Sequence, residues 1–186
     1  MDDGLTAAWE EHRAATEGWR ELVVGLTGQQ ANWRPEPSSW SVAQCLEHVR
    51  IVTEEVLPGL EVAIAEAREE GRTATGPFRY GLIGRRFLAG QDPLRRRRVR
   101  TLRLYQPSSS KIELAAAVGR FAAVQATFAE VMTAADGTDL VQVMVPSPAQ
   151  PLLRLSVGIW LQALPRHTLR HLRQAQEVAD RQERIG

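Results

Sequence analysis

The histidine pair His167 and His171 is the feature of this sequence whose spacing points most directly to chemistry. On a helix, side chains four positions apart lie one turn apart on the same face, so both imidazoles can reach one metal ion. The pair continues an apolar stripe through Trp160, Ala163 and Leu164, which predicts that it faces the interior. Burying two imidazoles without partners costs on the order of a few kcal/mol, and a metal ion offsets that cost. Two core or surface histidines that share this spacing by chance are the alternative.

A third histidine, His48, is predicted to lie on the inward face of an earlier helix, together with Cys45, Ile51 and Val52. Three neutral imidazoles with an open coordination position are typical of a catalytic rather than a structural site for zinc or a similar ion. Such an ion lowers the pKa of a bound water or thiol and makes it a nucleophile near neutral pH. Because imidazole suits zinc, nickel, copper and iron alike, these residues do not choose the metal.

Three further side chains are candidates for supporting roles near the histidines. Gln44 and Gln174 lie one turn from His48 and His171 respectively, where each could orient an imidazole or a bound water. Cys45 precedes His48 by one turn and could approach the ion. Cysteine is also a common small core residue, and we favour that interpretation.

The fourth histidine, His12, also lies on a predicted apolar face, but helix lengths argue against direct coordination. His48 stands about two turns from the connector that joins the first two helices, whereas His12 stands nearly four turns from it. At about 1.5 Å per residue, the offset is roughly 10 Å. We therefore expect His12 to be a core histidine paired with Glu54 or Glu55, or a residue that lines the pocket.

Four segments carry the apolar period of a helix, and their order predicts an all-α four-helix bundle with a long crossover between the second and third helices. The segments span residues 5–26, 42–68, 114–131 and 155–178. Ser39 or Ser41 is expected to cap the second helix. Pro58 and Pro165 lie inside the second and last helices and predict bends, the latter one turn before the paired histidines. Strand signals are weak, and only residues 140–145 alternate.

The crossover, residues 71–110, shows no clear period and is rich in glycine, proline and arginine. Its length argues against simple up-down-up-down connections, and a short helix is expected near residues 80–88. Its positive charge fits either a phosphate-binding patch or a solvated loop balanced by glutamates of the second helix. No aromatic residues interleave with the arginines, so nucleic acid is not the favoured partner. The arginines concerned are Arg85, Arg86, Arg95, Arg96, Arg97, Arg98, Arg100 and Arg103.

Length and composition predict one folded domain spanning residues 1–186. The chain is 44% apolar and 24% charged, and its net charge of +1 gives no global field that would recruit nucleic acid or a membrane surface. Its single cysteine, Cys45, excludes an internal disulfide. No signal peptide is visible, and no run approaches the roughly 20 apolar residues that a membrane span requires. We therefore expect a soluble cytoplasmic protein.

Two short motifs in this chain resemble those of a known family. Residues 40–49 read WSVAQCLEHV and residues 167–174 read HTLRHLRQ. They resemble the segments that open the second helix and close the bundle in DinB-like metal-binding four-helix bundle proteins. The preceding segment 32–35, NWRP, and Pro107 before the third helix are also similar, so the resemblance extends from the first helix to the last.

The resemblance implies a divalent ion, zinc or nickel, held by His48, His167 and His171. It also implies frequent homodimers. Characterised members of the family include thiol S-transferases that use bacterial low-molecular-weight thiols, and a thiol-dependent isomerase is a more distant relative. Pro165 departs from the pattern close to the implied ligands and could shift their register.

A metal-dependent thiol S-transferase that acts on a small-molecule substrate is the function that we favour, on the strength of the resemblance. From the residues alone, an ion that activates water to hydrolyse an amide or ester fits equally. A non-enzymatic module that binds anions or nucleic acid through the crossover, and a metal kept for structure or storage, are further alternatives. We find no serine nucleophile elbow, phosphate-cradling glycine loop or paired-carboxylate signature. The sequence names no substrate.

Overall fold

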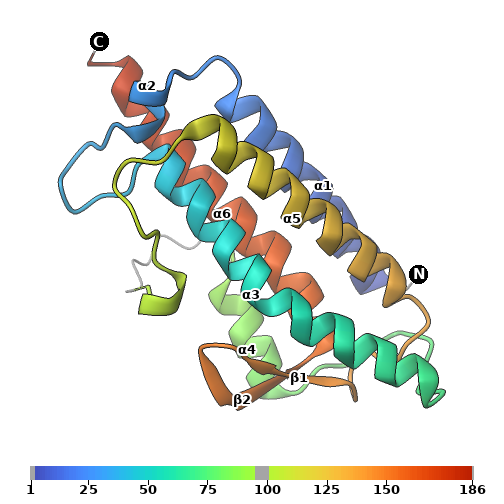
Figure 1. Ribbon diagram of the computed structural model, residues 1–186. Helices are drawn as coiled ribbons and strands as arrows, with labels where there is room; N and C mark the ends of the chain where they lie inside the picture. The colour runs from blue at the N-terminus through green and yellow to red at the C-terminus, as the bar shows by residue number, and fades with distance from the viewer. Residues whose placement is uncertain (1–2, 95–100, 186) are drawn as a thin grey trace.

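The computed structural model describes residues 3–94 and 101–185 and consists largely of helices (Figure 1). Four long helices form a bundle, namely α1 (Asp3–Val23), α3 (Val42–Glu69), α5 (Leu114–Ala134) and α6 (Val157–Glu183). Shorter elements lie in the connections: α2 (Gly28–Asn32), α4 (Leu82–Gly90), the 3-10 helix η1 (Arg103–Tyr105) and the strands β1 (Met144–Ser147) and β2 (Gln150–Ser156). The predicted all-α bundle, with a long connection between its second and third long helices, is confirmed.

The core of the bundle is divided into two apolar clusters. In the first, Leu60 of α3 packs with Ile159 of α6 and with residues of both strands, and we call it the hairpin cluster. In the second, Leu46 of α3 packs with Leu172 of α6 and with Ala31 of α2, and we call it the α2 cluster. The N-terminal half of α3 therefore packs on the C-terminal half of α6, so these helices run antiparallel (Figure 1).

The start of α3 is fixed by a capping box, which sets the position of every side chain that follows. The Ser41 hydroxyl accepts a hydrogen bond from the Gln44 backbone N–H at 3.2 Å, and the Gln44 amide oxygen accepts one from the Ser41 N–H at 3.1 Å. This reciprocal pair satisfies two backbone donors that a helix start leaves open. Of the two serines that the sequence offered as caps, the structure selects Ser41. Both α3 and α6 run through their internal prolines without a break.

The first helix ends earlier than its apolar period predicts. Gly25, with a φ of +82°, follows the last turn of α1, and such a backbone conformation favours glycine and stops a helix. The chain then enters α2, which begins with a capping box between Thr27 and Gln30. The apolar pattern continued to Leu26 because that residue packs against the α2 cluster from outside the helix.

The segment before α6 is a β-hairpin, which corrects the prediction that the last helix begins at Leu155. Strands β1 and β2 pair antiparallel, with Val145 opposite Leu155 and Met144 opposite Ser156. Leu155 lies four residues before Ile159, so it fits the helical period as well as an alternating strand. Pairing with β1, which a local period does not reveal, decides between the two. The helix starts after Ser156.

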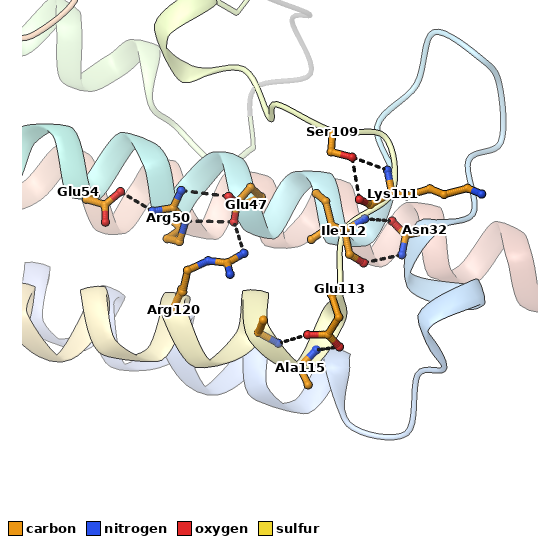
Figure 2. Close-up of polar contacts among 11 residues, drawn as sticks. Asn32, Glu47, Arg50, Glu54, Ser109, Lys111, Ile112, Glu113, Ala115 and Arg120 are labelled. Carbon is orange, nitrogen blue, oxygen red and sulfur yellow. Dashed lines mark hydrogen bonds and ion pairs between the residues drawn. The ribbon is translucent and has the colours of Figure 1, made fainter.

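The crossover between α3 and α5 contains α4, close to the helix predicted near residues 80–88, and then η1. The basic run Arg95 to Arg98 and Arg100 lie outside the described residues, so the structure leaves the predicted anion patch there untested. The crossover ends at Ile112, whose backbone forms two hydrogen bonds with the Asn32 side chain of α2. The Asn32 amide nitrogen donates to the Ile112 carbonyl oxygen, and the Ile112 N–H donates to the Asn32 amide oxygen, both at 2.8 Å (Figure 2).

Replacing Asn32 with alanine is expected to lower the free energy of unfolding by about 2 kcal/mol, because two part-buried backbone groups of Ile112 lose their partners. Urea unfolding followed by circular dichroism measures the change. Gln29→Ala, at an exposed position of the same short helix, is the matched control. Equal destabilisation by the two substitutions would show that these two hydrogen bonds contribute nothing of their own.

A charged network joins α3 to α5 (Figure 2). Arg50 donates to both carboxylate oxygens of Glu47 at 3.0 Å and also contacts Glu54. Arg120 of α5 lies 3.6 Å from Glu47. The side chains of Glu47 and Arg50 are each only 12% exposed. Glu47 is the carboxylate nearest to His48 in sequence, and it forms ion pairs with Arg50 and Arg120.

Helix α5 corrects the expectation that no segment approaches the apolarity of a membrane span. Its 21 residues reach a mean hydropathy of 1.2 over the most apolar window, of which 28% is buried. The apolarity comes largely from alanine, whereas the predicted apolar face of this helix was defined by its larger side chains. In the structure α5 packs on α3 and α1 through Phe121 and Phe128, as a member of the bundle.

Candidate metal centre

Three of the four histidines meet in the bundle, as their spacing predicts. His48 comes from α3, and His167 and His171 come from successive turns of α6. One ring nitrogen of each lies within 4.8 Å of the others, and His48 Nε2 is 3.2 Å from His167 Nε2. The internal Pro165 therefore does not disturb the register that brings the pair to His48.

A backbone carbonyl fixes the orientation of His48. Its Nδ1 lies 2.7 Å from the carbonyl oxygen of Tyr105, which can only accept, so Nδ1 carries the proton. The lone pair is then on Nε2, the nitrogen that faces His167. This is the arrangement that metal-binding histidines show, with the far ring nitrogen held by an oxygen acceptor. Tyr105 belongs to η1, so the crossover supplies this contact.

The two α6 histidines carry buried ring nitrogens that lack a protein partner. Nδ1 of His167 and Nδ1 of His171 make no hydrogen bond within the part of the chain that the structure describes. Leaving a polar atom buried and unpaired costs about 1–3 kcal/mol. Three imidazoles with available lone pairs, converging from two helices, are a donor set that suits a divalent ion. The residues present therefore fit a metal.

All three rings are held in the neutral form that binds metals. Burial lowers the pKa of His48 to about 4 and that of His171 to about 3. Burial, followed by the charges of the neighbouring histidines and Arg170, lowers the pKa of His167 well below its ordinary value. Because protons compete with a metal for imidazole lone pairs, these directions favour metal binding down to mildly acidic pH.

Comparison with known families finds one match. A sequence model of the DinB superfamily matches residues 8–175, which include all three clustered histidines. The chain belongs to the DinB superfamily. No curated protein matches it. No solved structure matches it either.

In this DinB-superfamily protein the centre opens on a large groove with a volume of about 1650 Å³, lined by one face of α6 and by parts of α3, α4, η1 and β2. Trp40, just before α3, forms one wall, with its ring centroid 4.8 Å from that of His48 and 6.0 Å from that of His171. Arg170 also lines the groove, and its Nη1 donates to the Gly90 carbonyl oxygen at the end of α4 at 3.1 Å.

The predicted supporting residues divide into those near the site and those committed elsewhere. A hydrogen bond between Gln174 and His171 raises the pKa of His171 against the effect of burial, as expected of an orienting residue. Gln44 lines the groove, but its amide oxygen is used in the capping box. Cys45 is a fully buried member of the α2 cluster, and burial raises the pKa of its thiol, in agreement with the core interpretation.

His12 lies in the core rather than among the three clustered histidines. Its ring packs edge-on against Trp9 and Phe128, with centroids 5.8 and 5.3 Å away, and it is only 5% exposed. The predicted pairing with Glu54 or Glu55 is absent from the contacts of the described residues, because aromatic side chains surround the ring instead. It is also not among the residues that line the groove.

The site contains three residues whose roles the sequence did not indicate. Trp40 stands in the family-like motif, but nothing in its spacing indicates that it packs on two histidines. Tyr105 acts through its carbonyl, which any residue carries, and it follows a stretch without a period. Arg170 was open to inference, because it lies three residues after His167 and so shares part of its helix face.

The stability of the metal-free protein is expected to depend on pH through His12. Burial lowers the pKa of His12 to about 4, against 6.5 in the unfolded chain, so the unfolded state binds more protons between these values. Protonation of His12 on unfolding should therefore lower the free energy of unfolding by about 2 kcal/mol between pH 7 and pH 5. His12→Leu should reduce the loss seen in wild type by that amount.

Urea unfolding of chelator-treated wild type and His12→Leu at pH 7 and pH 5 measures this difference. The three clustered histidines contribute equally in both proteins, so their effect cancels. An identical pH dependence in the two proteins would contradict a buried neutral His12.

Proposed function

We propose that this DinB-superfamily protein is a metal-dependent enzyme of the thiol S-transferase type, with zinc or nickel held by His48, His167 and His171. The observation that carries the proposal is the convergence of three imidazoles that line one groove. Three protein ligands leave a coordination position for a reactant, as in catalytic zinc sites. When bound there, a divalent ion supplies the positive charge that lowers the pKa of a thiol or water and makes it nucleophilic.

The chain's own residues prepare the site for that ion. The Tyr105 carbonyl holds the His48 tautomer, and Gln174 contacts His171, so two of the three rings are oriented by neighbours. The Trp40 ring packs against two of the imidazoles, those of His48 and His171. The Arg170 guanidinium lines the same groove and lowers the pKa of all three histidines, so its positive charge also favours an anionic sulfur nearby.

The proposed reaction joins a low-molecular-weight thiol to an electrophilic small molecule. The thiol loses its proton to solvent, its sulfur forms a bond to the electrophilic carbon, and the leaving group departs with the electrons of the bond that breaks. The groove volume of about 1650 Å³ exceeds the roughly 300–1000 Å³ of a typical single-ligand pocket, which supports a site for two reactants.

The test begins with protein purified without an affinity tag, because a histidine tag would itself bind metal. Mass spectrometry should find near-stoichiometric zinc or nickel in wild type and little in His171→Ala. The loaded protein is then mixed with a panel of small thiols and a bimane electrophile, and thioether formation is followed by fluorescence. Turnover by wild type and its loss in His171→Ala is the expected result.

Two results would overturn the proposal. Metal-loaded protein that leaves every thiol unreacted, but cleaves amide or ester substrates, would identify a hydrolase that uses the same centre. Protein that takes up no metal at all would leave a helical bundle with buried histidines.

A further inference from the structure

The groove beside the metal centre changes character along its length. On α6, the residues that line it before His167 are apolar and buried, and they include Trp160 and Leu164. After His171 the lining residues are polar except for Val178, and Arg173 and Arg181 are exposed. The three histidines therefore stand at the boundary between an apolar half and a polar half of one groove.

The opposite wall repeats this division. On α3, Gln44 lies one turn before His48 and Val52 one turn after it, and both line the groove. Because α3 and α6 run antiparallel, Gln44 is on the same side of the centre as Arg173, and Val52 is on the same side as Leu164. Two helices far apart in sequence thus agree on which half is polar.

Other elements extend each half. Phe87 of α4 packs edge-on against Trp160 with ring centroids 5.4 Å apart, and Leu153 of β2 adds an aliphatic side chain to the apolar half. At the polar half, Ser38 and Ser39 line the groove before α3 begins. This gives one half the character of a hydrophobic contact surface and the other the character of a hydrogen-bonding surface.

Positive charge predominates among the ionic side chains that line the groove. Four are arginines, namely Arg86, Arg170, Arg173 and Arg181, and two are acids, namely Glu177 and Asp180. Five of the six follow His167 on α6, and Arg86 comes from α4. On α6, Arg170 at the level of the histidines, with Arg173 and Arg181 beyond them, outnumbers the two acids by one charge. Guanidinium groups bind carboxylates through paired hydrogen bonds, so this stretch of α6 favours an anionic ligand.

We propose that the two reactants occupy opposite halves of this groove: a polar thiol bearing a carboxylate lies along Arg173 and Arg181, and an apolar electrophile lies on Trp160, Leu164, Phe87 and Leu153. This assignment rests on the proposed function, because the sulfur and the electrophilic carbon must meet at the histidines. It names the chemical class of each reactant, which the metal centre by itself leaves open.

Binding to the cobalt(II)-loaded protein tests the two halves without turnover. Mercaptosuccinate and 1-hexanethiol both present sulfur to the ion but differ in their tails, and binding is followed by the sulfur-to-cobalt absorption band. In Arg173→Gln/Arg181→Gln, mercaptosuccinate affinity should fall at least tenfold while hexanethiol affinity stays within about twofold. In Leu153→Asp the pattern should reverse, because each buried methylene accounts for about fourfold in affinity.

Arg184→Gln removes one arginine charge from the exposed end of α6, outside the residues that line the groove, and is the control for loss of surface charge. Cobalt stoichiometry and circular dichroism verify that each variant is folded. Phe87→Gln tests the apolar half from another element if Leu153→Asp fails to fold. Equal responses of both thiols to both classes of variant would overturn the division of the groove.

Failure of the proposed function gives a different result. If cobalt binds but neither thiol produces the absorption band, the assignment of a thiol reactant is wrong. Hexanoyl and succinyl hydroxamates, which bind metals through oxygen, then test the two halves with the same variants and the cobalt visible spectrum. Opposite responses of these two probes support an apolar and an anionic half, and equal responses reject them.

Discussion

Replacing His167 with alanine is expected to lower the affinity for a divalent ion by more than about 100-fold. Loss of a partner that merely orients a ligand typically costs 10–100-fold, and His167 is the ring whose Nε2 lies 3.2 Å from that of His48. Isothermal titration of tag-free, chelator-treated protein with zinc measures the change. His12→Ala is the matched control, because His12 lies among aromatic residues of the core and should leave the affinity unchanged.

Thermal unfolding separates metal binding from folding. At a free zinc concentration 100 times the wild-type dissociation constant, the metal should stabilise wild type by about 2.7 kcal/mol. The His167→Ala protein should gain about 0.4 kcal/mol or less at the same concentration, since its affinity is at least about 100-fold lower. Retention of wild-type affinity in this variant would mean that the cluster is not the metal site.

The second large effect is expected at the charged network between α3 and α5. Arg50→Ala should lower the free energy of unfolding by about 3 kcal/mol, because Glu47, at 12% exposure, would retain among the described residues Arg120 alone as an ion-pair partner, 3.6 Å away. Equilibrium unfolding in urea at pH 7 gives the value. Arg13→Ala, which removes an exposed arginine paired with Glu10 on α1, is the matched control and should change stability by less than about 0.5 kcal/mol.

Removing both members of the pair distinguishes a buried charge from simple loss of packing. Glu47→Leu/Arg50→Met should recover most of the stability lost in Arg50→Ala, since the desolvated carboxylate is gone and apolar contacts replace it. A double variant less stable than Arg50→Ala would show instead that the ion pair itself holds the helices together.

The sequence predicted the parts of the fold and site that depend on local spacing. The four long helices follow from their apolar period, and the meeting of His167 and His171 follows from the geometry of one helical turn. His48 could be placed because the apolar period of the second helix puts it on the inward face with Cys45 and Val52. The metal itself stays a prediction.

The remainder depends on contacts between segments that a period does not reveal. Leu155 satisfies a helical and an alternating pattern equally, and only its pairing with Val145 makes it part of a strand. The Tyr105 carbonyl reaches His48 from the crossover through a backbone atom, which no choice of side chain reports. His12 has aromatic neighbours rather than the predicted glutamates because the apposition of α1 and α5 places Phe128 against its ring.

The division of the core into two clusters has a consequence for how the bundle opens. Along α3, Val49 belongs to the α2 cluster and Val56 to the hairpin cluster, and along α6 Leu172 and Leu164 divide in the same way. On α6, His167 and His171 lie between the two clusters, and on α3 His48 lies next to Val49, where the α2 cluster ends. Such a core behaves as two cooperative units with separate opening free energies. An ion bound by α3 and α6 at this position would link these units, so that their backbone amides exchange with solvent together when it is present and separately when it is removed.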